Sequence, residues 1–274
     1  HMEAGTAKPT SCQRRRVRHH MIDVVDPAEH FDVAMWRRGA LEALVGIEAR
    51  GKVAIVCGGS GLYLRSLARG IFPGPSYDQG LRARLNEEER ERPGLLHSRL
   101  STLDPSCAEK VHPNDLVRTV RALEVMELTG RPMSSWQRAH GLAERLFEVF
   151  ELEVSMERDH LYGAIDERCR AMVAAGIVEE LVGLRSRGYS PRLQAFSAIG
   201  YREAGACIDG TLRREELAGT VARATRRYAK RQITWLRNQA LSETSAVVAS
   251  GDMDCSLKLV RGFLRDVATP QSIG

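Results

Sequence analysis

Residues 52–65 read K-V-A-I-V-C-G-G-S-G-L-Y-L-R, and the order of elements in this stretch decides the fold. The run from Lys52 to Cys57 is apolar and rich in β-branched side chains, which predicts a buried parallel strand. Gly58 and Gly59 then break the pattern, and the spacing from Leu62 to Arg69 predicts a helix. Strand, glycine turn and helix in this order are typical of an α/β fold, in which ligands bind at the carboxyl ends of the strands.

Further segments extend this pattern along the chain. Met21 to Val25 predicts a second short strand, and Ala34 to Arg50 predicts a crossover helix that makes the two strands parallel neighbours. Phe147 to Val154 alternates between apolar and polar side chains, which predicts a strand that returns to the same sheet. Asp159 to Arg187 has helical spacing with an interruption at Gly176, whereas the C-terminal tail shows no clear pattern.

The region from Asp78 to Ala143 differs from its flanks, because it is charged, rich in helix signals and poor in strand signals. Leu81 to Glu91 and Leu116 to Leu128 are its clearest predicted helices. The simplest organisation is therefore an α/β core formed by residues 3–77 and 144–274, which is interrupted by a helical insertion domain at residues 78–143.

The composition is that of an ordinary folded protein. Of the 274 residues, 43% are hydrophobic and 27% are charged, and the net charge of +5 gives a mild preference for anionic partners. The six cysteines are scattered without a C-x-x-C pair, which argues against a zinc site or a disulfide framework and for a reducing cytoplasm. No apolar run approaches the roughly 20 residues of a membrane helix, so no membrane association is expected. Adjacent His19 and His20 would point to different sides of a strand, so no metal site is predicted.

A second informative stretch is R-A-T-R-R-Y-A-K-R-Q-I-T-W-L-R at residues 223–237, which contains six basic residues. No acidic residue occurs between Leu217 and Ser242. Positions three and four apart are neighbours on a helix, so one face would collect the cations Arg223, Arg226, Arg227, Lys230 and Arg237. Such a face suits a polyanion such as diphosphate or nucleic acid, the alternative being an ordinary solvated amphipathic helix.

The glycine turn, G-G-S-G-L-Y at residues 58–63, is a candidate anion site. Backbone amides at such a turn can hold an anion and Ser60 could add a hydroxyl, although a tight strand-to-helix turn gives the same pattern. The nearby G-I-E-A-R-G-K at residues 46–52 has the spacing of a phosphate-binding loop. We reject it, because Val53 follows where Ser or Thr is needed and because the segment precedes a strand.

The segment from His112 to Asp115 leads into a predicted helix that carries two arginines. Arg118 and Arg121 are three residues apart and therefore lie on one face. This pair could contact phosphates, or it could simply form ion pairs with Glu124 and its neighbours. His112 itself is more typical of a turn or capping residue than of a catalytic base.

Six segments in order resemble the motifs of one family, the bacterial tRNA dimethylallyltransferases, also called tRNA isopentenyltransferases. The resemblance covers most of the chain, and six motifs in family order are highly specific. The segments are G-T-A-K-P-T (5–10), H-H-M-I-D-V-V-D-P (19–27), G-G-S-G-L-Y-L-R (58–65), H-P-N-D-x-x-R-x-x-R-A-L-E-V (112–125), A-I-G-Y-R-E (198–203) and A-T-R-R-Y-A-K-R-Q-I-T-W-L-R (224–237). The resemblance implies a P-loop NTPase-like parallel sheet flanked by helices, with a helical insertion that contacts tRNA.

The resemblance also implies a reaction, prenyl transfer to the tRNA anticodon stem-loop. The N6 amine of the adenosine just 3′ of the anticodon attacks C1 of dimethylallyl diphosphate, and diphosphate leaves. This chemistry needs cations and amide donors directed at the leaving group. The adenine must be flipped out of its stack, and the RNA loop must be held through its phosphates and stacked bases.

Particular residues acquire roles from the resemblance. Arg226 would hold the diphosphate, and Ser60, where the family commonly has Thr, would position the amine or a phosphate oxygen. The tRNA contacts from the insertion would be made by Arg82, Val117, Arg118 and Arg121. The nucleotide path would be lined by Ser197, Ala198, Ile199, Gly200, Tyr201 and Arg202. Tyr201 would either stack on a base or pack in the core, and Lys230 and Arg231 would contact RNA phosphates or pair with core acids.

The sequence departs from the family pattern at its start. Members of the family begin with a strand, a phosphate-binding loop and a segment with a catalytic Asp, and this sequence begins after them. The resemblance implies Mg²⁺ as cofactor, yet the usual Mg²⁺ ligands, the loop lysine and the general base are missing here. Truncation, supply by another chain, or a degenerate homologue would each explain this. We expect loss of a central strand to lower stability or to cause self-association through the incomplete sheet.

Two other functions share these sequence features. A catalytically inactive tRNA-binding homologue or fragment would keep the RNA-gripping residues without transferring a prenyl group. A prenyltransferase that acts on free adenine nucleotides would share the core motifs. A mononucleotide does not need an additional helical domain with an arginine pair, so the insertion favours tRNA as the substrate.

Overall fold

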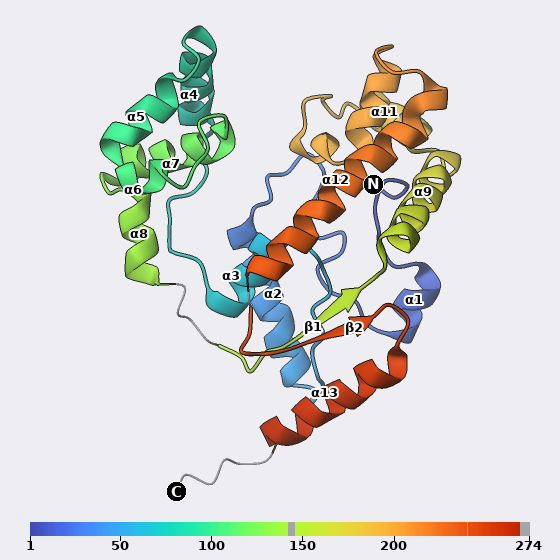
Figure 1. Cartoon of the computed structure of the whole chain (residues 1–274). Coiled ribbons are helices and arrows are strands. Elements are labelled where there is room, and N and C mark those ends of the chain that lie inside the picture. Colours follow the sequence, from blue (N-terminus) through green and yellow to red (C-terminus); the bar gives the residue numbers. More distant parts are fainter. Residues whose placement is uncertain (142–145, 240, 269–274) are drawn as a thin grey trace, which may run out of the picture. The chain divides into compact units, whose positions relative to one another are not determined.

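The computed structural model describes residues 1–141, 146–239 and 241–268, and it shows a helix-rich α/β protein with a small parallel sheet (Figure 1). The chain forms two compact units, unit 1 from residues 1–68 and 146–274 and unit 2 from residues 69–145. The predicted insertion at 78–143 falls within unit 2. Within the described ranges, no helix is long and apolar enough to cross a membrane.

The first part of unit 1 contains three helices, α1 (Ser11–Arg16), α2 (Val33–Glu48) and α3 (Gly61–Arg69). The Asp32 carboxylate caps α2 by accepting the N–H groups of Ala34 and Met35, each at 2.9 Å. The structure therefore confirms the helices predicted at 34–50 and 62–69. Trp36 of α2 stacks on Tyr63 of α3 with ring centroids 4.9 Å apart, which holds these two helices together.

The strands predicted at Lys52–Cys57 and Met21–Val25 are wrong. Residues 52–60 have no regular secondary structure, and Ile55 is 81% exposed. A run of β-branched residues has a high propensity to form a strand. A strand also needs a neighbour that pairs with its backbone N–H and C=O groups, and no other described segment pairs with residues 52–57. Met21 and Asp23 have φ of 58° and 56°, which are left-handed values that an extended strand cannot contain.

The described sheet consists of β1 (Phe150–Ser155) and β2 (Thr244–Ala249), which pair in parallel from Phe150 opposite Thr244 to Ser155 opposite Ala249. This confirms the strand predicted at 147–154, which begins three residues later than expected. The C-terminal tail, whose sequence shows no clear pattern, forms β2 and the amphipathic helix α13 (Met253–Ala268). Phe263 of α13 stacks on Phe150 of β1 at 5.4 Å between ring centroids, so an apolar face covers the sheet.

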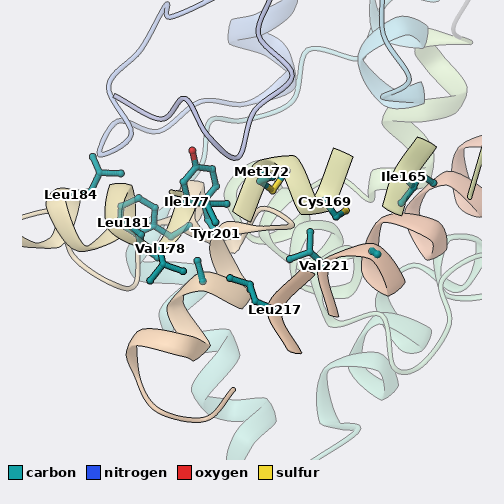
Figure 2. Close-up of a cluster of buried hydrophobic side chains, with 13 residues drawn as sticks. Ile165, Cys169, Met172, Ile177, Val178, Leu181, Leu184, Tyr201, Leu217 and Val221 are labelled. Carbon is teal, nitrogen blue, oxygen red and sulfur yellow. The ribbon is translucent and has the colours of Figure 1, made fainter. Parts of the chain in front are cut away.

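The core of unit 1 lies among helices rather than under the sheet (Figure 2). It is built from α9 (Arg158–Ala174), α10 (Ile177–Ser186), the 3₁₀ turn η1 (Gln194–Ser197), α11 (Tyr201–Ile208) and α12 (Arg214–Asn238). Gly176 separates α9 from α10 with φ of 86°, which confirms the predicted interruption. Buried side chains from these elements, including Leu181, Tyr201, Leu217 and Val221, fix one half of α12 against α9 and α11.

In the described part of unit 2, the regular secondary structure is entirely helical, and residues 70–78 have none. Its elements are α4 (Gln79–Glu91), α5 (Leu95–Leu103), α6 (Pro105–Ala108), α7 (Leu116–Thr129) and α8 (Met133–His140). Leu85, Leu100 and Leu123 are fully buried between the helices. The buried Asp104 carboxylate accepts the N–H groups of Cys107 at 3.2 Å and Ser134 at 2.9 Å, so a polar contact links the starts of α6 and α8.

Candidate functional site

The glycine turn at residues 58–61 lies directly against the C-terminal half of α12. A Cβ atom on Gly59 would overlap the Gln232 side-chain amide, and one on Gly61 would overlap the Trp235 indole. The contact with the Trp235 ring favours glycine strongly at position 61, whereas at position 59 only the flexible end of the Gln232 side chain would have to move. This arrangement brings two of the resembling motifs, G-G-S-G and K-R-Q-I-T-W, together in one place.

Ser60 lies exposed in this turn, directly before the first residue of α3. Its carbonyl accepts the N–H groups of Tyr63 at 2.9 Å and Leu64 at 3.1 Å, so the turn is fixed by the first bonds of the helix. Further along α3, the Ser66 hydroxyl donates to the Tyr63 carbonyl at 2.7 Å, and Arg37 Nε donates to the Ser66 carbonyl at 2.8 Å. The Ser60 hydroxyl is thus presented to solvent from a firmly held backbone.

Arg226 lies on a different side of α12 from the glycine turn. It forms an ion pair with Asp166 of α9, and its guanidinium carbon is 5.6 Å from the centre of the Tyr162 ring. At 100° per residue, Arg226 is rotated by about 240° from Gln232 and by about 180° from Trp235. The structure therefore does not bring Arg226 and Ser60 to one face of the helix.

Lys230 and Arg231 are both exposed on α12. Arg231 is four residues before Trp235, so it lies on the side of the helix that contacts the glycine turn. Its guanidinium carbon is 5.6 Å from the centre of the Tyr228 ring. Of the predicted cations, Arg231 therefore has the position on α12 that is closest in angle to the Ser60 turn.

The predicted nucleotide path, residues 197–202, is partly open and partly buried. Ser197, Ala198 and Arg202 are exposed, whereas Tyr201 is 1% exposed and belongs to the core. The Tyr201 hydroxyl donates to Glu180 Oε1 at 2.5 Å and accepts the Gly5 N–H at 3.2 Å. Burial and this bond to Glu180 raise the pKa of Tyr201 above its usual range. In this structure Tyr201 is a packing residue that cannot stack on a base.

Hydrogen bonds and ion pairs connect the early motifs to this region. The Gly5 bond to Tyr201 joins the 5–10 motif to the 198–203 motif. Asp23 of the 19–27 motif pairs with Lys8, and also with Arg14 at 3.3 Å. Hydrogen bonds from Lys8 and Arg14 outweigh slight desolvation and lower the pKa of the Asp23 carboxyl. Segments that are far apart in the sequence are therefore held together in unit 1.

Unit 2 assembles the predicted insertion residues on one face of α7 and the start of α4. Val117 is 79% exposed, and the exposed Arg118 approaches Asp115 at 3.4 Å. Arg82 and Arg121, by contrast, both bind the carboxylate of the buried Glu124. In this structure Arg121 pairs with Glu124 and Arg118 with Asp115, and a phosphate contact by either arginine stays a prediction.

Sequence reasoning missed several residues of these arrangements. Gln232 and Trp235 were visible only as members of a motif, and Asp166 and Glu180 gave no signal. Asp166 and Arg226 are 60 positions apart, and Glu180 and Tyr201 are 21 apart, so no local spacing predicts either contact.

A hollow of about 560 Å³ lies elsewhere in unit 1, beside α2. Its lining combines the apolar side chains of Phe31 and Met35 with the cations Arg18, Arg38 and Arg50. It contains none of the site residues predicted from the sequence. In the described part of the chain, no three His, Cys, Asp or Glu side chains are grouped so that they could hold a metal ion.

Comparison with known proteins gives one consistent result. Residues 1–239 match the family profile described as IPP transferase. A tRNA dimethylallyltransferase of Geobacter sulfurreducens is 47% identical over 237 residues, which are 86% of this chain and 76% of that protein. A tRNA dimethylallyltransferase of Geobacter metallireducens is 45% identical over 264 residues, 96% of this chain and 84% of that protein.

Solved structures agree with these sequence relatives. The full-length tRNA isopentenylpyrophosphate transferase of Bacillus halodurans superposes with a TM-score of 0.66 and 34% identity, covering 97% of this chain and 83% of that chain. A eukaryotic dimethylallyltransferase crystallised acting on tRNA has a TM-score of 0.77 with 23% identity over 98% of this chain and 71% of that chain, which shows a shared fold alone. These neighbours confirm the expected P-loop NTPase-like α/β class. With the profile spanning most of the chain and relatives at this identity, the chain belongs to the IPP transferase family.

Proposed function

We propose that this chain transfers a dimethylallyl group from dimethylallyl diphosphate to N6 of the adenosine 3′ of the anticodon in tRNA. The observation that supports this most strongly is the contact of the G-S-G turn with Gln232 and Trp235 of α12, on the side of the helix that also carries the exposed Arg231. Membership of the IPP transferase family and the names of the relatives point in the same direction.

The chemistry requires a nucleophile and a leaving group held in line. The N6 lone pair forms the new bond to C1 as the C1–O bond breaks, diphosphate departs with the bonding electrons, and N6 releases one proton to a base or to water. Negative charge grows on the leaving oxygen, so cations fixed near it lower the barrier. The amine is a weak nucleophile, so its orientation by a fixed hydroxyl also contributes.

Residue roles follow from this requirement. Ser60 positions the amine or a phosphate oxygen from the turn, with backbone amides beside it as further donors. Arg226 holds the diphosphate, for which it must exchange Asp166 for the ligand. Lys230 and Arg231 bind RNA phosphates, and the exposed part of the 197–202 segment, Ser197, Ala198 and Arg202, borders the nucleotide path.

We propose that unit 2 binds the anticodon stem-loop through the face formed by Arg82, Val117, Arg118 and Arg121. This face is cationic with an exposed apolar side chain, which suits phosphates next to unstacked bases. It favours an RNA substrate over a free adenine nucleotide, because a mononucleotide cannot reach a second contact surface.

The family resemblance implies Mg²⁺, and in the described part of the chain no three His, Cys, Asp or Glu side chains are grouped. An Mg²⁺ ion needs only one or two protein ligands when water and the oxygens of a diphosphate complete its shell, so the ion would arrive with the diphosphate. Activity with and without added Mg²⁺ would show whether the diphosphate brings an ion of its own.

Transfer of label from dimethylallyl diphosphate to an anticodon stem-loop tests the proposal directly. Wild-type chain should transfer label, and Ser60→Ala should reduce the rate. Salt-sensitive binding of the RNA without transfer would instead support the inactive tRNA-binding alternative. Transfer to adenosine monophosphate but not to the stem-loop would favour the free-nucleotide alternative.

We also propose that the chain self-associates and acts in the cytoplasm. The support for self-association is the 52–57 segment, whose apolar side chains are exposed and whose backbone pairs with no other described segment. A second copy could supply the missing hydrogen-bond partners. The cytoplasm is where a tRNA-modifying enzyme meets its substrate.

A further inference from the structure

Glu124 of α7 is a fully buried acid, with 0% of its surface exposed. Its Oε1 accepts the Asp78 N–H at 3.0 Å and Arg82 Nε at 2.8 Å. Its Oε2 accepts Arg82 Nη2 at 2.7 Å and Arg121 Nη1 at 2.5 Å. Both carboxylate oxygens are therefore satisfied, and the acid binds two of the residues assigned to tRNA contact.

The arrangement places the negative charge inside and the positive charges outside. The side chains of Arg82 and Arg121 are 27% and 28% exposed, whereas that of Glu124 is 0% exposed. Two guanidinium groups against one carboxylate leave a net positive charge on the outer side of the cluster. A buried acid is costly unless it is paired, so this carboxylate strongly holds both arginines.

Each arginine is also fixed by a second contact. Arg121 Nη2 donates to the Pro75 carbonyl at 2.9 Å, and the guanidinium carbon of Arg82 lies 4.5 Å from the centre of the Tyr77 ring. Arginine on an open surface loses side-chain entropy when it binds a ligand. Here that ordering has already occurred in the folded protein.

We propose that Glu124 is a positioning residue for RNA recognition, which presents Arg82 and Arg121 as one preordered cationic site for an RNA phosphate. The site lies beside Val117 and Arg118 on the same face of α7, since positions 117, 121 and 124 follow helical spacing. This inference rests on the proposed function of the chain.

The test compares Glu124 with Glu127 on the same helix. Glu127 also binds two arginines, Arg84 and Arg99, but neither of these is assigned a contact with tRNA. Glu124→Gln puts an amide donor against the guanidinium donors, so it should release the arginines while keeping the side-chain volume. Glu127→Gln makes the same chemical change at the matched control.

The measurement is the Kd of the full-length chain for an anticodon stem-loop over a range of salt concentrations. Glu124→Gln should raise Kd by about tenfold at low salt and reduce the slope of log Kd against log salt by about one phosphate contact. Glu127→Gln should change Kd by less than about twofold. Thermal unfolding of both variants separates lost stability from lost binding.

An unchanged or lower Kd for folded Glu124→Gln would overturn the inference, because the arginines would then bind RNA equally well without the Glu124 carboxylate. If Glu124→Gln does not fold, Arg121→Lys serves instead. Lysine keeps the charge and can still pair with Glu124, but it lacks the second nitrogen that contacts Pro75, so a loss of RNA affinity with normal stability is expected. Absence of RNA binding by the wild type would reject the proposed function itself.

Discussion

Arg226 of α12 and Asp166 of α9 form an ion pair beside the ring of Tyr162, so the arginine assigned to diphosphate is engaged in this structure. A diphosphate must compete with this carboxylate. Asp166→Asn removes the competitor and should lower KM for dimethylallyl diphosphate by about two- to fivefold, the range expected of a partly exposed pair. Arg226→Ala should raise the same KM. Steady-state transfer assays check this, and an unchanged KM in both variants would place diphosphate elsewhere.

The glycine turn offers a sharper test with an internal control. Gly59→Ala must displace Gln232 and Gly61→Ala must displace Trp235, whereas nothing lies within 4 Å of a Cβ at Gly58. We expect transfer activity to fall by at least about tenfold for Gly61→Ala, because small displacements of a reacting group cost rate steeply. The fall should be smaller for Gly59→Ala, because the flexible end of Gln232 can move aside. Gly58→Ala should stay within about twofold of the wild type. Equal rates in all three variants would show that the contact with α12 is irrelevant to catalysis.

The roles of Arg231 and Arg226 can be distinguished by the substrate whose binding each substitution weakens. Arg231 lies on the side of α12 that meets the Ser60 turn, and Arg226 lies towards α9. Arg231→Ala should weaken RNA binding and reduce its salt dependence by about one phosphate contact, with little effect on KM for dimethylallyl diphosphate. If Arg231→Ala raised the KM for dimethylallyl diphosphate and Arg226→Ala did not, Arg231 would be the residue that binds the diphosphate.

The stability of unit 2 should depend on pH through Glu124. Burial opposes its ionisation, but hydrogen bonds from Arg82, from the Asp78 N–H and from Arg121 outweigh burial and hold its pKa below the ordinary 4.5. An acid whose pKa is lowered by folding stabilises the fold above its unfolded pKa, and this contribution is lost as pH falls through the folded pKa. The difference in unfolding free energy between wild type and Glu124→Gln should be constant from pH 7 to about pH 5 and shrink below about pH 4.5.

That difference is measured by urea unfolding followed by circular dichroism. Other acids of the chain titrate equally in both proteins, so they cancel. A difference that does not change between pH 6 and pH 3 would mean that folding leaves the pKa of Glu124 unshifted, which would contradict the prediction.

Self-association can be tested at the exposed apolar segment. Ile55→Lys should abolish concentration-dependent association in sedimentation experiments, because a charge on an unpaired edge opposes strand addition. Val17→Lys is the control, since Val17 is 66% exposed and lies outside the segment. A wild type that stays monomeric over the accessible concentration range contradicts the proposal.

The helices were predictable from sequence because their signals are local. Asp115 and Gly130 mark the ends of α7, and Gly176 marks the break between α9 and α10. The strands were less predictable because pairing is not local. The Lys52–Cys57 run has the composition of a strand without a described partner, while β1 finds its partner some 90 positions further on.

In the candidate site, too, the sequence indicated individual residues but not their tertiary contacts. The glycine turn and the arginine spacing indicated Ser60 and Arg121, and the family resemblance added Arg82, but neither could show which groups these residues contact. The burial of Glu124 and Tyr201 and the pairing of Arg226 with Asp166 depend on tertiary packing. Each of these contacts changes what the neighbouring cation or hydroxyl is able to bind.

The length of α12 gives distant core residues an influence on the site. Leu217 is fully buried at one end of this 25-residue helix, and Gln232 meets the glycine turn about four turns, or roughly 22 Å, further along. The helix behaves as a stiff rod, so a tilt of only about 5° at Leu217 would move Gln232 by roughly 2 Å. Substitutions that loosen the packing of Leu217 could therefore impair transfer without touching a single substrate contact, and sequence variation in this remote core would act on reaction rate as well as on stability.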